Sequence, residues 1–180
     1  MNIKLMKEKE DLQKEFDMKY QPINEFREKR AANCINDVKN TFVEFFKSQG
    51  FSITNKTDDI CATYKNIEIV LSKPDKQEPR IGYSLFFTLL VNNNNYSIPV
   101  IYQSSKKRRS IGSHSYIAAS PDEKLDKEIK YLKEDIAALP EYFESIKSEE
   151  PYFGYYISKN DKVKYEYRTF SELLESIFNS

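Results

Sequence analysis

Apolar side chains in the first fifty residues recur at helical spacing, weakly at first and then strongly. Before residue 21 they form a thin stripe, which consists of Leu5, Leu12, Phe16 and Tyr20. From residue 24 to Gly50 the stripe is wider and includes Cys34, Ile35, Val38, Phe42, Phe45 and Phe46. The wider stripe predicts a core helix that ends at Gly50, whereas the thin stripe predicts a helix that needs support from outside itself. Pro22 stands between the two and predicts an interruption.

Short runs of β-branched and aromatic residues follow, separated by turn-forming residues. The runs cover residues 51–55, 60–65, 67–72, 81–91 and 96–102. Asparagines at 92–95 tolerate positive φ and predict a hairpin turn. Pro99 has no amide donor, so we expect the last of these strands at a sheet edge or with a bulge. Two more aromatic runs, at 152–157 and 163–167, predict a second hairpin.

A heptad pattern covers residues 121–147. Its apolar positions, spaced alternately four and three apart, are Leu125, Ile129, Leu132, Ile136, Leu139, Phe143 and Ile146. This spacing predicts a helix whose apolar seam faces another helix. Ser120 suits the N-cap and Pro121 the first turn, whereas Pro140 lies inside the pattern and predicts a kink or a break. Residues 171–178 predict a short closing helix.

The order of these elements predicts the α+β class. We expect an antiparallel sheet of about five to seven strands with long amphipathic helices on one face, made up of the N-terminal helices and the heptad-patterned helix near 121–147. The chain has 180 residues and is expected to form a single domain, 1–180. Residues 1–21 are a candidate for a projecting helix, and 103–120, which lack periodicity, are expected to form an exposed basic loop.

Composition excludes several functional classes. The 28 basic and 28 acidic residues balance, so the chain lacks the broad basic field of a typical DNA-binding protein. No apolar run approaches the roughly 18 residues that a membrane span needs, so we expect no membrane partner. Cys34 and Cys61 are too few for a disulfide framework and are expected to be buried thiols, which favours the cytoplasm. Phosphate-loop, dinucleotide and zinc motifs are absent, so we expect no cofactor, metal or catalytic residue.

The clearest candidate contact site is a basic run followed by small hydroxyl residues. Its candidate contact residues are Lys106, Lys107, Arg108, Arg109, Ser110 and His114. Guanidinium groups bind phosphate, and serine hydroxyls and loop amides donate to it. A nucleic-acid backbone, a nucleotide or an acidic protein surface would satisfy this pattern, and a solvated loop is the alternative. Tyr102 and Tyr116 lie on either side and are suited to stack on bases.

Two features relate to nuclease chemistry. The spacing of Arg109 and His114 resembles the Arg-x4-6-His motif of HEPN-type ribonucleases, over six residues. That family carries its motif in a helical bundle and completes its site in a dimer, whereas this segment is predicted as a loop after a strand. A metal-dependent nuclease would need clustered carboxylates, such as Asp58, Asp59 and Glu68, but Val70 stands where restriction-type folds have a lysine.

These patterns favour a non-enzymatic protein-binding module, such as an adaptor, an inhibitor or an immunity-type protein. Another protein is the expected partner, and the stripe of Leu5, Leu12, Phe16 and Tyr20 is the candidate helix interface, also for a homodimer. The strand near Pro99 and the acidic C-terminal half are further candidate surfaces. The alternatives are a nucleic-acid-associated protein that uses residues 106–109, and a nuclease-like enzyme. The bias toward Asn, Lys, Ile and Tyr suggests a low-GC bacterium or its phage.

Overall fold

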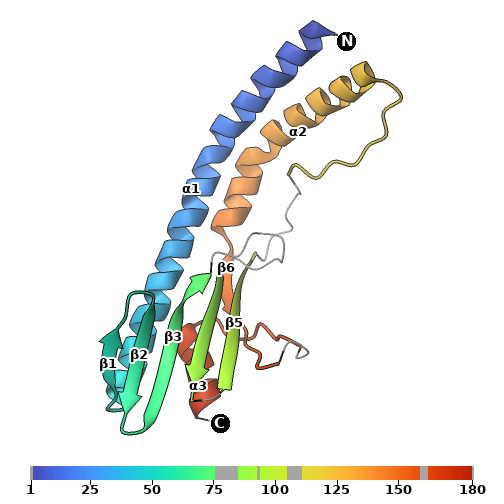
Figure 1. The fold of residues 1–180 in the computed structure, drawn as a ribbon. Helices are drawn as coiled ribbons and strands as arrows, with labels where there is room; N and C mark the ends of the chain where they lie inside the picture. The colour runs from blue at the N-terminus through green and yellow to red at the C-terminus, as the bar shows by residue number, and fades with distance from the viewer. Residues whose placement is uncertain (1, 76–84, 93, 105–110, 159–161, 180) are drawn as a thin grey trace. The chain divides into compact units, whose positions relative to one another are not determined.

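A computed structural model describes residues 2–75, 85–92, 94–104, 111–158 and 162–179. Within these residues three helices and a six-stranded antiparallel sheet are present, which confirms the predicted α+β class (Figure 1). In chain order the elements are α1 (Ile3–Ser48), β1 (Ser52–Asn55), β2 (Asp59–Tyr64), β3 (Ile67–Asp75), β4 (Leu85–Val91), β5 (Asn94–Gln103), α2 (Pro121–Lys147), β6 (Glu150–Phe153) and α3 (Phe170–Phe178).

The chain forms two compact units, and α1 contributes to both. The helical unit consists of Met1–Glu28 and Ser104–Glu149. The sheet unit consists of Lys29–Gln103 and Glu150–Ser180. The expectation of a single domain stays a prediction.

The sheet unit has its strands in chain order, and each strand is antiparallel to its neighbours. Alternate side chains of the strands form one apolar face, which includes Ala62, Ile69, Leu71, Phe87, Leu89, Ile98 and Val100. The C-terminal half of α1 covers this face with Val38, Phe42 and Phe46, and α3 adds Leu173 and Leu174. The long N-terminal helix therefore packs on the sheet, as its apolar spacing predicts.

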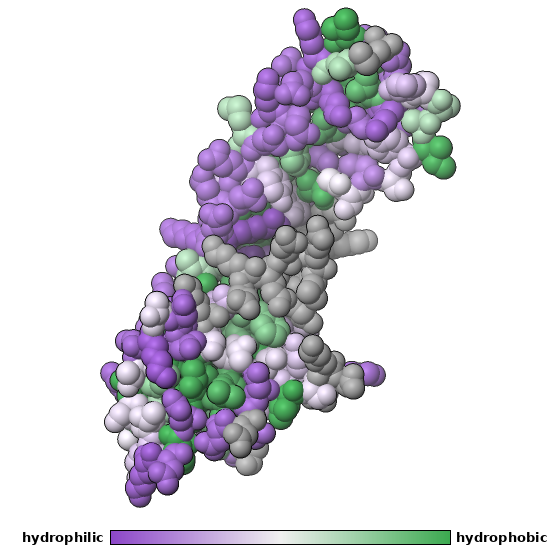
Figure 2. Space-filling view, viewed as in Figure 1, coloured by the Kyte–Doolittle hydropathy of each residue, from purple (hydrophilic) through white to green (hydrophobic). Residues whose placement is uncertain are grey.

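The opposite face of the sheet is less completely buried. Val70, Phe86 and Ile101 are half-buried there, and Leu90 is 40% exposed. Figure 2 shows apolar side chains gathered over the strands on this side. The sheet therefore has one fully packed face and one partly apolar outer face.

The expectation for Pro99 is wrong, because β5 lies inside the sheet between β4 and β6 and keeps a regular register through Pro99. Its missing amide donor is tolerated for a local reason. The residue opposite is Gly154, whose amide donates to the Pro99 carbonyl at 3.2 Å. The reverse bond of this pair is the one that the proline cannot make, and beyond it Ser97 and Tyr156 again exchange two backbone hydrogen bonds.

The expected second hairpin forms only in part within the described residues. Its first run begins with β6, which extends the sheet beside β5. A single bridge between Phe153 and Tyr167 joins it to the second run. Gly154 lies so close to that run that a Cβ atom on it would be 2.6 Å from Val163 Cγ1. This approach of the two runs therefore requires a glycine.

The helical unit pairs the N-terminal half of α1 with α2. Both helices run in the same direction, because Lys9 contacts Glu128 and Tyr20 stacks on Tyr142 further along (Figure 1). The apolar cluster of this unit contains the buried residues Ile23, Leu139, Tyr142 and Ile146, with Phe16, Tyr20, Phe26, Ile111 and Phe143 packed against it. Of the predicted helix-to-helix seam of residues 121–147, this cluster confirms the C-terminal positions Leu139, Phe143 and Ile146.

Neither internal proline ends its helix. α1 continues through Pro22 and α2 through Pro140, so the predicted interruption at Pro22 is wrong and α2 is one helix. A proline inside a helix costs about 3 kcal/mol. Ile23 and Leu139, the residues next to these prolines, are both buried in the same apolar cluster. Their packing stabilises the helices where the prolines weaken them.

Candidate functional site

Residues 111–119 form an extended segment along α2, which we call the strap. Gly112 N donates to Asp135 Oδ2 at 3.1 Å, and Ala119 N donates to Glu123 Oε2 at 2.6 Å. The strap therefore runs opposite to the helix. Twelve helical residues span about 18 Å, and seven strap residues cover that length at about 2.6 Å each, which requires a nearly extended chain.

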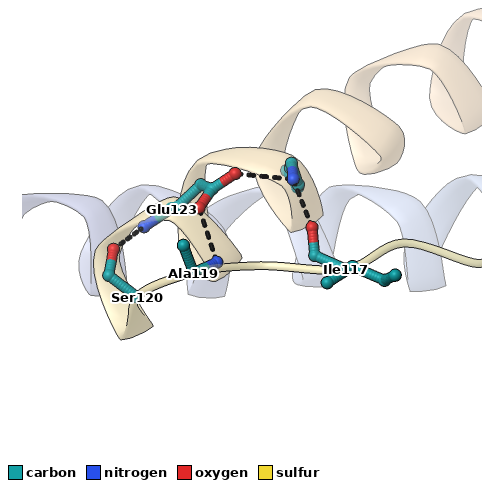
Figure 3. A network of polar contacts seen from close by, with 5 residues as sticks. Ile117, Ala119, Ser120 and Glu123 are labelled. Atoms are coloured by element: carbon teal, nitrogen blue, oxygen red, sulfur yellow. Dashed lines mark hydrogen bonds and ion pairs between the residues drawn. The ribbon is translucent and has the colours of Figure 1, made fainter.

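The C-terminal end of the strap is fixed by the first turns of α2 (Figure 3). Ser120 caps the helix by accepting a hydrogen bond from Glu123 N at 3.1 Å. The Glu123 carboxylate accepts from Ala119 N and from Lys127 Nζ, and Lys127 also donates to the carbonyl of Ile117. The hydrogen bond from Lys127 is the main reason that the pKa of Glu123 is lowered.

Side chains of the strap alternate between the helix and solvent. His114 and Tyr116 are half-buried, whereas Ser115 and Ile117 between and beside them are exposed. Ile117 is 91% exposed, although it is fully apolar. An anchored strap thus displays an isoleucine to solvent.

A buried carboxylate lies beneath the strap. Asp135, on α2, is only 3% exposed, and its Oδ2 atom accepts from Gly112 N and lies 2.9 Å from His114 Nε2. The His114 ring stacks on Tyr131 with centroids 4.2 Å apart and planes 7° apart. Gly112 has φ +74°, a left-handed conformation that favours glycine. Asp135 Oδ1 is also buried and has no hydrogen-bond partner in the part of the chain that the structure describes.

A second carboxylate, Glu128, is fully paired. Its Oε1 atom accepts from the Tyr116 hydroxyl at 2.8 Å, and its Oε2 atom lies 2.6 Å from Lys9 Nζ on α1. The hydrogen bond from Lys9 is the main cause that lowers the pKa of Glu128. The hydrogen bond to Glu128 in turn raises the pKa of Tyr116. This group ties the strap to both helices.

These groups line a pocket of about 390 Å³ within the helical unit. Its walls are Phe16, Tyr116, Tyr131 and Leu132, and its polar groups are Lys9, Gln13, Gly112, His114, Glu128 and Asp135. Aromatic walls with a few convergent polar groups, at this volume, are typical of ligand-binding pockets. Asp135 orients the His114 ring. No serine, cysteine or threonine is among the described lining residues, so these residues supply no hydroxyl or thiol nucleophile for the histidine to activate.

The structure tests the predicted contact residues unevenly. Residues 106–110, with the whole basic run and Ser110, lie outside the described residues, so the phosphate site stays a prediction. His114 lies at the pocket. The stripe of Leu5, Leu12, Phe16 and Tyr20 is half-buried. Phe16 and Tyr20 pack against the apolar cluster of the helical unit, and the wider use of the stripe as an interface stays a prediction.

Sequence reasoning missed Asp135 and Tyr131. The signal for Asp135 was available, because it lies three residues after Leu132 and four before Leu139, on the apolar stripe of α2. A carboxylate on a buried stripe needs a partner or a function. For Tyr131 no pattern in the sequence indicated stacking on a loop histidine.

The sheet unit holds another pocket, of about 360 Å³, next to the β1–β2 turn. Asp58 and Asp59 line it together with Lys56, which lies 3.8 Å from Glu68. No group of three or more potential metal ligands occurs among the described residues. The carboxylates expected for a metal-dependent nuclease therefore do not form such a group there.

Of the helices that the structure describes, none combines the length and the apolar character needed to cross a membrane. Compared with known proteins, the chain matches no family model, no curated protein and no solved structure.

Proposed function

We propose that this protein is a binding module that acts by associating with another protein through the strap face of its helical unit. The observation that carries the proposal is Ile117, 91% exposed on a segment that hydrogen bonds fix on both sides. Burying an isoleucine contributes about 1.5–3 kcal/mol. Because the strap is already ordered, little conformational entropy is lost when a partner covers it, which is the property of an anchor residue.

The role proposed is that of an adaptor, inhibitor or immunity-type protein without enzymatic activity. The free and buried thiols of Cys34 and Cys61 suit a reducing compartment, so we propose the cytoplasm as its location. The partner in a narrower form of this proposal is a second copy of the chain, so that the protein forms a homodimer through its helices.

Site-specific photo-crosslinking in the native host tests the proposal. A photoreactive amino acid at position 117 is expected to give one dominant protein adduct. The same group at position 130, an exposed site on α2 outside the strap, is the matched control. Equal adducts from both positions, or adducts with nucleic acid alone, would contradict the proposal.

The identified partner then permits a binding measurement. Ile117→Asp is expected to weaken binding at least tenfold, because a charge replaces the apolar anchor. Ile157→Asp, at an exposed isoleucine of the sheet unit, is expected to leave binding unchanged. Calorimetry measures the affinity of both variants for the partner. Weaker binding of Ile117→Asp alone indicates a local anchor, whereas weaker binding of both indicates a general effect of the added charge.

Nucleic-acid association is the second candidate. The observation that favours it is the series of rings formed by Tyr116, Tyr131 and His114, which follows the basic run in the chain. Aromatic rings beside cationic side chains bind single strands by stacking. Oligonucleotide binding that falls steeply with salt, and is lost when residues 106–109 become alanine, would support this candidate over the first. For the nuclease-like alternative, unchanged cleavage by His114→Ala would remove the only imidazole candidate for the proton transfer.

A further inference from the structure

We propose that the pocket beneath the strap binds a planar cationic side chain, and that its occupant is an arginine of the protein partner. This inference rests on the proposed function and names the chemistry of the partner at the same site. Three properties of the pocket support it: its charge, an unused buried acceptor and its aromatic wall.

The described lining of the pocket holds two carboxylates, Glu128 and Asp135, and one lysine, Lys9. Lys9 and Glu128 lie 2.6 Å apart and neutralise each other. Asp135 pairs with His114 at 2.9 Å, and no lysine or arginine among the described residues forms an ion pair with it. A buried carboxylate without a cation is costly, so a cationic ligand that reaches it is strongly favoured.

The buried carboxylate also has spare acceptor capacity. Asp135 Oδ2 serves both Gly112 and His114, whereas Oδ1 has no partner among the described residues. Nearly all buried polar atoms in proteins are hydrogen-bonded. A guanidinium group presents parallel N–H donors that match both oxygens of a carboxylate.

His114 already holds the place that a guanidinium would take. Its ring is planar, it is hydrogen-bonded to Asp135, and it stacks on Tyr131 with planes only 7° apart. Because Oδ1 is shielded from solvent, the ligand reaches Asp135 by displacing this ring, whose side chain is 23% exposed. The arginine would then stack on Tyr131 and bind the carboxylate at the same time.

Guanidinium groups also contact tyrosine side chains elsewhere among the described residues. The guanidinium of Arg27 donates to the hydroxyls of Tyr20 and Tyr142 at 2.8 and 2.7 Å. In the sheet unit, the guanidinium carbon of Arg30 lies 3.8 Å from the centre of the Tyr102 ring. Lysine, whose ammonium is compact and not planar, would gain less from such a wall.

Titration of the full chain with small probes tests the inference by two-dimensional NMR. N-acetyl-arginine amide is expected to shift the Gly112 amide and the His114 ring signals saturably, with a Kd of about 1–10 mM, as suits a small fragment. N-acetyl-citrulline amide has nearly the same shape without the charge and is expected to bind at least tenfold more weakly. Equal binding of both probes, or no saturable shift with the arginine probe, would overturn the inference.

Variants locate the binding. Asp135→Asn is expected to abolish the shifts, and the matched control Asp126→Asn, at an exposed carboxylate of α2, to leave them unchanged. Tyr131→Leu keeps the carboxylate and is expected to weaken binding about tenfold through the lost stacking. If Asp135→Asn and Tyr131→Leu both bind the arginine probe as the parent chain does, the pocket is not the site. Saturable shifts with inorganic phosphate in place of the arginine probe would also overturn the inference.

The two proposals can fail separately. An adduct at position 117 together with a silent arginine titration would leave the protein-binding function standing and remove the arginine pocket. Arginine-specific binding without any adduct at position 117 would keep the pocket and remove the strap as the anchor.

Discussion

The two units of the chain are stabilised in different ways. In the sheet unit seventeen buried residues form one apolar cluster, whereas the apolar cluster of the helical unit contains four, counted over the described residues. The helical unit depends instead on polar and aromatic pairs, among them Arg27 with Tyr20, Lys9 with Glu128, and His114 with Asp135.

This difference is the basis for placing the proposed binding site in the helical unit. A continuous apolar core needs no ligand to explain it, because burial alone stabilises it. A buried carboxylate oxygen without a partner carries a desolvation cost, and such exceptions to the usual pairing of buried polar atoms are expected at functional sites. We therefore propose that the sheet unit serves as a scaffold and that the helical unit is the part that binds.

The largest expected effect is the loss of a core ring in the sheet unit. Phe42 is fully buried between α1 and the sheet, and Phe42→Ala is expected to lower the free energy of unfolding by about 3–5 kcal/mol. Ile23→Ala in the helical unit is expected to cost less, about 2 kcal/mol, because fewer buried neighbours surround it. Urea unfolding followed by circular dichroism measures both, and an equal loss in the two variants would contradict the comparison.

Removing the buried carboxylate should have an intermediate effect. Asp135→Ala leaves Gly112 N and His114 without their acceptor and is expected to cost about 1–3 kcal/mol. Hydrogen exchange of the Gly112 amide should also become faster, because its hydrogen bond is lost. Asp126→Ala, at an exposed position of the same helix, is expected to change stability by less than about 0.5 kcal/mol. Unchanged exchange at Gly112 would show that Asp135 does not hold the strap.

The sheet unit was predictable because its signals are local. β-branched and aromatic runs separated by turn residues placed β1 to β5 within a few residues of their bounds where the structure describes them, and the helix that ends near Gly50 followed from its wide stripe. The effects of Pro22 and Pro99 were misjudged because they depend on tertiary neighbours, and of the two alternatives predicted for Pro140 the break does not occur. Burial of Ile23 and Leu139 stabilises the helices at Pro22 and Pro140. No pattern in a single sequence shows which residue will lie opposite Pro99.

The pocket was only partly predictable. His114 was singled out as the only histidine, and Tyr116 for its place beside the basic run. Their partners Asp135 and Tyr131 lie about twenty residues further on, and the link depends on the strap running antiparallel to α2. A long connection without periodicity gives no sequence signal for such a course.

Glycine substitutions compare the two units at a smaller scale. Gly112 in the strap has φ +74° and Gly50 in the sheet unit has φ +84°, and an added Cβ would meet nothing within 4 Å at either position. Alanine at each is therefore expected to cost only the left-handed backbone term, about 1–2 kcal/mol. Thermal melting measures the cost, and hydrogen exchange should place it at the strap for Gly112→Ala and at the end of α1 for Gly50→Ala. A much larger loss of stability at one position would mean that neighbouring atoms there leave no room for the added Cβ atom.

The smallest expected effect is a loosening of the helical unit in acid. The pKa values of Glu8, Glu123 and Glu128 are lowered from 4.5, in each case chiefly by a hydrogen bond from a lysine. A carboxylate whose pKa is lower in the folded chain stabilises the fold fully above its unfolded value, and this stabilisation is lost as the pH falls through the folded value. Amides of α2 should therefore exchange faster below pH 4.5 than sheet amides in the same sample. Lys9→Gln removes the hydrogen bond that chiefly lowers the pKa of Glu128, so the increase in amide exchange in acid should become smaller near that residue. An unchanged increase would mean that other groups cause it.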